Sequence, residues 1–123
     1  EQAAAVDSVR GACFLINKSS WKKLFAAAGP YLDERYFIWF EEVDFCRQVK
    51  EKGGEVWYSP AATLVDYVGA SFNQVDRPKK QGYFAESMLR YFLKWHPRWQ
   101  ARILRWAWFL VGVKLPTLNK LND

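Results

Sequence analysis

Apolar residues recur at helical spacing in the middle of the chain. Counted from Glu42, they stand at the third, fourth and seventh following positions: Phe45, Cys46 and Val49. This spacing puts all four side chains on one face of an α-helix. It predicts a helix over residues 41–52, with Glu42 at the head of the apolar face.

The same patterns predict the other elements. Strands are expected over 9–17, 55–59 and 62–67, loops over 31–40 and 73–81, and helices over 21–28, 83–95 and 98–113. The order is strand, helix, loop, helix, two strands and two helices. It indicates an α/β or α+β fold of short strands packed with helices, and by itself it specifies no function.

The last predicted helix is unusually apolar. Trp99, Ile103, Trp106 and Leu110 form its stripe, and arginines flank it. One small domain has little need of so wide an apolar surface. Two interpretations stay open: a basic amphipathic helix lying on a membrane surface, or a helix docked on another protein or on a second copy.

Composition narrows the class of protein. The chain has 123 residues, half of them apolar, which suffices for one small domain with a core and argues against disorder. The net charge of +5 suits a phosphate-bearing partner: a nucleotide, a nucleic acid or an anionic lipid. The aromatic residues fall at helical core spacing rather than on a strand platform, so a nucleic-acid partner is not expected.

Cysteine and histidine offer little metal chemistry. Cys13 and Cys46 both stand in apolar surroundings and are expected to be buried small hydrophobic residues. His96 is the single histidine, so no zinc-site spacing is present.

Three acids stand at the predicted start of the central helix. Burial would raise the pKa of Glu42, whereas the helix N-terminus favours its anion, and a group held between these effects suits a general base. Glu41 and Asp44 are expected about 100° away, toward water or a cleft. The alternative is that all three are ordinary first-turn acids.

Two further segments have two interpretations each. Small residues at Gly11-Ala12, inside the predicted strand 9–17, indicate either a closely approaching ligand or backbone, or a packing constraint. The basic run in the predicted loop 73–81 either covers an anionic ligand or is a solvated loop.

Four short motifs follow one another between residues 6 and 96: Gly11-Ala12-Cys13, Asp33-Glu34-Arg35, the run from Phe40 to Cys46, and Gly69-Ala70-Ser71. In this order and spacing the chain resembles the C-terminal half of bacterial family 2 glycosyltransferases, in particular the rhamnosyltransferase-like members. The resemblance implies a GT-A fold. It also implies transfer of a sugar, such as rhamnose or another deoxyhexose, from a nucleotide-sugar to a glycan or lipid-linked acceptor in polysaccharide biosynthesis.

The resemblance also implies roles for single residues. Glu42 matches the catalytic base, which gives inversion at the anomeric carbon. Glu41 would bind acceptor hydroxyls, Trp39 would stack on a sugar ring, and Gly11 and Ala12 would line the acceptor site. Asp44 is expected to orient the helix start or to pair with Arg47.

Two departures from the family pattern matter. Asp66 stands where the family has a metal-ligand histidine, and it is either a ligand for Mg²⁺ or Mn²⁺ or a residue of a strand-end turn. The nucleotide-binding half with its D-x-D motif is missing from these residues. We therefore expect residues 1–81 to be the acceptor-side part with the base, residues 82–123 to be a helical pair, and the chain alone to be inactive.

Location and association follow from the same features. We expect a cytoplasmic enzyme that is peripheral on the inner face of the membrane. A sheet edge left uncovered by the missing half would favour homodimer formation. The alternative function is a non-catalytic membrane-surface or protein-interaction module.

Overall fold

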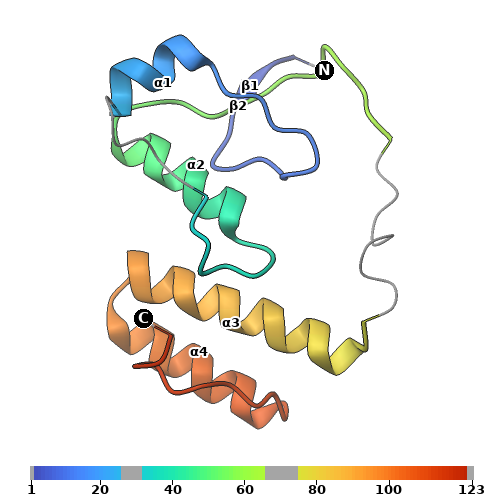
Figure 1. Ribbon diagram of the computed structural model, residues 1–123, viewed down its shortest axis with the longest axis vertical. Helices are drawn as coiled ribbons and strands as arrows, with labels where there is room; N and C mark the ends of the chain where they lie inside the picture. The colour runs from blue at the N-terminus through green and yellow to red at the C-terminus, as the bar shows by residue number, and fades with distance from the viewer. Residues whose placement is uncertain (1, 26–31, 66–74, 122–123) are drawn as a thin grey trace. The chain divides into compact units, whose positions relative to one another are not determined.

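The computed structural model describes residues 2–25, 32–65 and 75–121. Over these residues the protein mixes α-helices with a small antiparallel sheet (Figure 1). In chain order the elements are β1 (Ala4–Ala5), α1 (Lys18–Phe25), α2 (Glu41–Glu51), β2 (Trp57–Tyr58), α3 (Arg77–Trp95) and α4 (Arg98–Leu110).

The chain divides into two compact units. One comprises Glu1–Asp33 and Glu41–Val68, and the other comprises Glu34–Phe40 and Gly69–Asp123. We call them the α2 unit and the α3–α4 unit. The expected division into residues 1–81 and 82–123 stays a prediction.

The α2 unit combines the sheet with two helices. Strands β1 and β2 pair antiparallel, with Ala4 opposite Tyr58 and Ala5 opposite Trp57. The Phe45 ring is buried and meets Phe14 edge-on at 5.1 Å and Trp21 at 5.6 Å between ring centroids. The apolar face of α2 is therefore covered by aromatic rings from α1 and from the segment before it.

The predicted strand over residues 9–17 is wrong. Gly11 and Ala12 form a turn, and Asn17 begins α1 as its cap, because its Oδ1 accepts the backbone N–H groups of Ser19 and Ser20 at 3.0 and 3.1 Å. Cys13 is exposed, so its expected burial is wrong as well. An apolar run becomes a strand only where a neighbour completes its hydrogen bonds, and the partner of β2 is β1 instead.

Helix α2 confirms its prediction to within one residue. Gly53 follows it with φ at 76°, and the N–H of Gly54 donates to the carbonyl of Val49 at 2.9 Å. The helix therefore ends at a glycine with a left-handed backbone, a common way for helices to end. Residues 62–65 form no strand, and the rest of that predicted strand lies outside the described residues.

The α3–α4 unit is an antiparallel helical hairpin that turns at Pro97 (Figure 1). Its core consists of Leu89, Ala101 and Leu121, all essentially buried. Helix α3 begins six residues before the prediction, so the basic run at Arg77 lies in its first turn rather than in a loop. Proline fits there because a first helical turn leaves its N–H groups unbonded.

Helix α4 exposes the stripe that its periodicity suggested. Trp99 and Trp106 are 58% and 64% exposed, and Phe109 is 72% exposed, whereas Ala101 is fully buried. The helix buries Ala101 and leaves the rings of Trp99, Trp106 and Phe109 largely uncovered by the described part of the chain. No described helix combines the length and apolar character needed to cross a membrane.

Candidate functional site

The loop before α2 is held on α3. The Ser87 hydroxyl donates to the Ile38 carbonyl at 2.8 Å. Phe37 packs against Tyr83 at 4.6 Å, and Trp39 meets Phe84 edge-on at 5.8 Å between ring centroids. The aromatic run is therefore a packed segment of the α3–α4 unit.

The last two residues of this loop have unusual backbones. Trp39 and Phe40 have φ values of 62° and 71°, in the left-handed region that side chains with a Cβ disfavour. Strain of this kind costs about 1–3 kcal/mol per residue and persists where the surroundings enforce it. In the chain, the strained pair directly precedes Glu41 and Glu42.

Glu41 and Glu42 open α2 and are partly buried. Each has an Oε2 atom that is buried and makes no hydrogen bond within the described residues. Buried polar atoms in folded proteins are nearly always paired, so an unpaired carboxylate oxygen on each of two consecutive residues indicates a site for a hydrogen-bond donor.

Gly11 lies against the Glu42 side chain. A methyl group at position 11 would stand 3.8 Å from Cβ and 3.9 Å from Cδ of Glu42, which is ordinary contact distance. Ala12 follows Gly11 in the same exposed turn. The fold thus brings two expected site residues from distant parts of the sequence, Gly11 and Glu42, into contact, and Glu41 directly precedes Glu42 in the chain.

Asp44 corrects the predicted orientation of the acids. Its side chain is fully buried and accepts a hydrogen bond from Gln48 Nε2 at 2.7 Å. The expectation that Glu42 alone faces inward is therefore wrong. A partner four residues along the helix satisfies the buried carboxylate, and Arg47 forms an ion pair with Glu51 at 3.6 Å.

No family model, curated protein or solved structure matches this chain. The glycosyltransferase resemblance therefore stays a prediction from the motifs.

Burial shapes the electrostatics of Glu41. Desolvation raises the pKa of Glu41, and the neighbouring Glu42 charge adds to the rise, while a hydrogen bond from its own backbone N–H opposes it. Burial also raises the pKa of Cys46, one turn beyond Glu42, against a hydrogen bond from the Val9 backbone. A carboxyl group whose pKa is raised exchanges its proton at a pH closer to neutral, which suits acid–base catalysis.

We expect Glu41→Gln to stabilise the folded chain at neutral pH. A raised folded-state pKa favours the protonated carboxyl, so wild-type stability is greater below the unfolded pKa near 4.3 and is lost as pH rises through the folded value. Glutamine mimics the protonated form at every pH. Urea unfolding should show a larger free energy of unfolding for the variant than for the wild type at pH 7, and no difference at acidic pH. An equal increase at both pH values would contradict burial of the charge as the cause.

The described residues do not complete a metal centre. In residues 2–25, 32–65 and 75–121, no group of three or more His, Cys, Asp or Glu side chains is placed so that it could hold a metal ion. Asp66, the expected ligand, lies outside the described residues. A Mg²⁺ or Mn²⁺ site stays a prediction, and no chemical step below depends on one.

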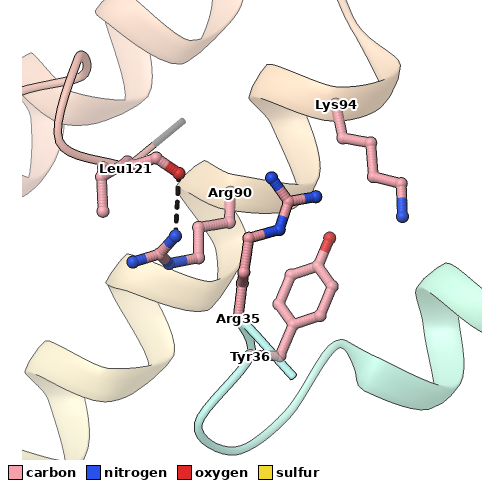
Figure 2. A pocket seen from close by; sticks show the side chains of 5 residues that line it. All are labelled: Arg35, Tyr36, Arg90, Lys94 and Leu121. Atoms are coloured by element: carbon pink, nitrogen blue, oxygen red, sulfur yellow. Dashed lines mark hydrogen bonds between the residues drawn. The ribbon is translucent and has the colours of Figure 1, made fainter. Parts of the chain in front are cut away.

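A pocket in the α3–α4 unit has no counterpart in the sequence predictions. Arg35, Tyr36, Arg90, Lys94 and Leu121 line it (Figure 2). The spacing of Arg90 and Lys94, four residues apart on one helix, was a signal for paired cations. A second hollow is lined by residues of β1, of the α2 end and of the segment before β2, and neither pocket includes Glu41 or Glu42. The expected binding of an acceptor sugar at Glu41 and Glu42 stays a prediction.

Proposed function

We propose that this chain is the acceptor-side part of an inverting glycosyltransferase with the GT-A fold. One observation carries the proposal: two adjacent glutamates begin α2, each with a buried unpaired oxygen, and Glu42 lies against Gly11. Glu42, the expected catalytic base, therefore contacts Gly11, an expected acceptor-site residue, within one unit.

The proposed step is a single displacement. A Glu42 carboxylate oxygen takes the proton from an acceptor hydroxyl as that oxygen bonds to the anomeric carbon of the donor sugar. The bond between the anomeric carbon and the nucleotide phosphate oxygen breaks, and the nucleoside diphosphate leaves with the electron pair. Attack opposite the leaving group inverts the anomeric configuration.

The neighbouring residues have supporting roles in this proposal. Glu41 accepts hydrogen bonds from other acceptor hydroxyls, and the turn at Gly11-Ala12 leaves room beside Glu42 because residue 11 has no side chain. A stacking role for Trp39 rests on the resemblance alone, since its ring packs edge-on against Phe84. The donor half, the glycan or lipid-linked acceptor and a divalent metal belong to the longer enzyme that we propose.

Stereochemistry tests this function. The longer protein should transfer a sugar from a nucleotide-sugar to a glycan or lipid-linked acceptor, and NMR of the product should show the opposite anomeric configuration to the donor. Residues 1–123 alone should show no transfer. Retention of configuration, or no transfer from a panel of nucleotide-sugars, would refute the proposal.

One observation favours a second candidate, binding to an anionic membrane surface. Five large apolar side chains of α4 are exposed: Trp99, Ile103, Trp106, Phe109 and Leu110. Exposed Arg98 and Arg102 belong to the same helix. Tryptophan and arginine on one helix match the composition of interfacial helices, which combine apolar insertion with attraction to anionic lipid.

We expect the double variant Trp106→Ser, Phe109→Ser to lose binding to vesicles that contain anionic lipid. Both side chains are largely exposed, so their replacement removes apolar surface without opening the core. Flotation with phosphatidylglycerol vesicles at low and high salt measures the binding of wild type and variant. The control Leu64→Ser removes an exposed apolar residue of the α2 unit. Equal flotation of wild type and double variant would exclude α4 as the contact.

A further inference from the structure

Ser87 carries a buried hydroxyl in the middle of α3. Its side chain is 2% exposed, and the neighbouring buried positions of the helix are taken by Ala85 and Leu89. A serine inside a helix can bond to a carbonyl of its own preceding turn. The Ser87 hydroxyl instead donates to the carbonyl of Ile38, 49 residues earlier in the chain, at 2.8 Å. The bond therefore joins α3 to the loop before α2.

The same face of α3 holds the next two residues of the loop. Phe84 and Tyr91 lie three positions before and four positions after Ser87, which places all three side chains on one side of the helix. The ring of Phe40 packs against both rings, at 5.5 and 5.6 Å between centroids. Trp39 meets Phe84 at 5.8 Å. The end of the loop is thus fixed by a hydrogen bond and by ring contacts to one helix face.

This anchoring accounts for a backbone that the residue types do not favour. Trp39 and Phe40 have φ values of 62° and 71°, which residues with a Cβ adopt when their surroundings enforce it. The peptide group between Phe40 and Glu41 follows directly, and its N–H donates to the carboxylate of Glu41 itself. The conformation of Phe40 therefore sets the direction of a donor that holds the Glu41 side chain.

We propose that Ser87 is a positioning residue for Glu41. Its hydroxyl fixes Ile38, and the fixed loop keeps Phe40 in its left-handed conformation. Phe40 in turn orients the N–H that donates to the Glu41 carboxylate. The inference rests on the proposed function only where it concerns the acceptor: Glu41 binds acceptor hydroxyls there, so Ser87 sets the affinity for the acceptor.

The pKa of Glu41 tests the structural part of the proposal in the 123-residue chain. Burial is the largest influence on this carboxyl and raises its pKa. Ser87→Ala should release the loop, expose the carboxylate to water and lower the pKa toward its ordinary value. Ser87→Thr keeps the hydroxyl and should retain the raised pKa. Carboxyl NMR over a pH series measures both variants, and a Glu41 pKa that is equal in wild type and Ser87→Ala would overturn the proposal.

The matched control is Leu118→Ala. Leu118 is partly buried against the core of the α3–α4 unit, so its truncation destabilises the same unit and leaves the Ser87 hydroxyl in place. The pKa of Glu41 in this variant should equal that of the wild type. If Leu118→Ala and Ser87→Ala shifted the pKa equally, Ser87 would act only through the stability of the unit, and the positioning role would be wrong.

Steady-state kinetics on the longer enzyme tests the consequence for the acceptor. Ser87→Ala should raise the acceptor KM by about tenfold or more, the usual effect of losing a hydrogen bond to a charged group. The kcat should stay near the wild-type value, because Glu42 keeps its contact with Gly11 within the α2 unit. An unchanged acceptor KM would contradict the role of Ser87 in acceptor binding.

A double-variant cycle shows whether Ser87 acts through Glu41. Glu41→Gln should raise the acceptor KM as well, and Ser87→Ala combined with Glu41→Gln should be no worse than Glu41→Gln alone, because effects on coupled residues do not add. Additive effects would refute action through Glu41. If the longer enzyme transfers no sugar while Ser87→Ala still shifts the Glu41 pKa, the proposed function fails and the positioning of Glu41 by Ser87 is supported.

Discussion

Replacing Glu42 by glutamine is expected to lower kcat for sugar transfer by about 10²–10⁴-fold. That is the usual contribution of a positioned general base. The amide keeps the shape of the side chain and its contact with Gly11, but it cannot accept a proton. The KM for the acceptor should change little, because the lost interaction operates in the transition state. Steady-state kinetics on the longer enzyme with a nucleotide-sugar and its acceptor measures both quantities.

The matched control for this variant is Glu51→Gln. Glu51 lies at the last position of α2, its side chain is 57% exposed, and it pairs with Arg47 across one helical turn. Its replacement should leave kcat near the wild-type value. If Glu41→Gln instead produced the large loss and Glu42→Gln did not, the base would be Glu41, whose pKa burial raises.

Gly54→Ala is expected to lower the free energy of unfolding by about 1–3 kcal/mol. A methyl group there would lie 2.7 Å from Leu24 Cδ1, 2.7 Å from Val49 Cγ1 and 3.1 Å from the Val49 carbonyl oxygen. The branched Val49 side chain is stiff and the carbonyl belongs to the helix, so both resist movement. Overpacking of this kind costs about that amount. Urea unfolding followed by circular dichroism measures the change.

Gly82→Ala is the paired control. Gly82 lies within α3, and a methyl group there would meet nothing within 4 Å. Alanine in a helix interior should stabilise by about 0.5–1 kcal/mol because glycine loses more backbone freedom on folding. Stabilisation by both substitutions would mean that Gly54 is not closely packed against Val49 and Leu24.

Local periodicity predicted the helices because a helix makes its hydrogen bonds within itself. The bounds of α2 were predicted to within one residue. The apolar spacing after Glu42 gave its course, and the glycine pair Gly53-Gly54 gave its end. The predicted end at residue 95 and the predicted start at residue 98 agree with the end of α3 and the start of α4, which lie on either side of Pro97. These signals lie within a few residues of the element that they define.

The strands and the orientation of α4 could not be predicted, because both depend on residues that are distant in the sequence. The apolar run at residues 9–17 has strand composition, but a capping bond at Asn17 and a turn at Gly11 outweigh it. Spacing showed that α4 is amphipathic, yet only its packing on Leu89 and Leu121 shows that Ala101 faces the core. The exposed face is thus the one that the sequence marked as apolar.

The candidate site was predictable in its residue types and not in its geometry. The pair of glutamates at the start of a helix followed from the sequence, and so did the small residues at Gly11-Ala12. The burial of Asp44 did not, although Gln48 four residues later could have indicated its partner. The left-handed backbone at Trp39 and Phe40 carries no sequence signal, because neither residue favours it.

The pH dependence of kcat/KM tests the proposed base most directly. A general base acts only when deprotonated, so the wild-type longer enzyme should lose activity in acid along a limb that reports the pKa of that group. We expect this acid limb to be present in Glu51→Gln and absent from the residual activity of Glu42→Gln. An acid limb that persists unchanged in Glu42→Gln would contradict Glu42 as the base.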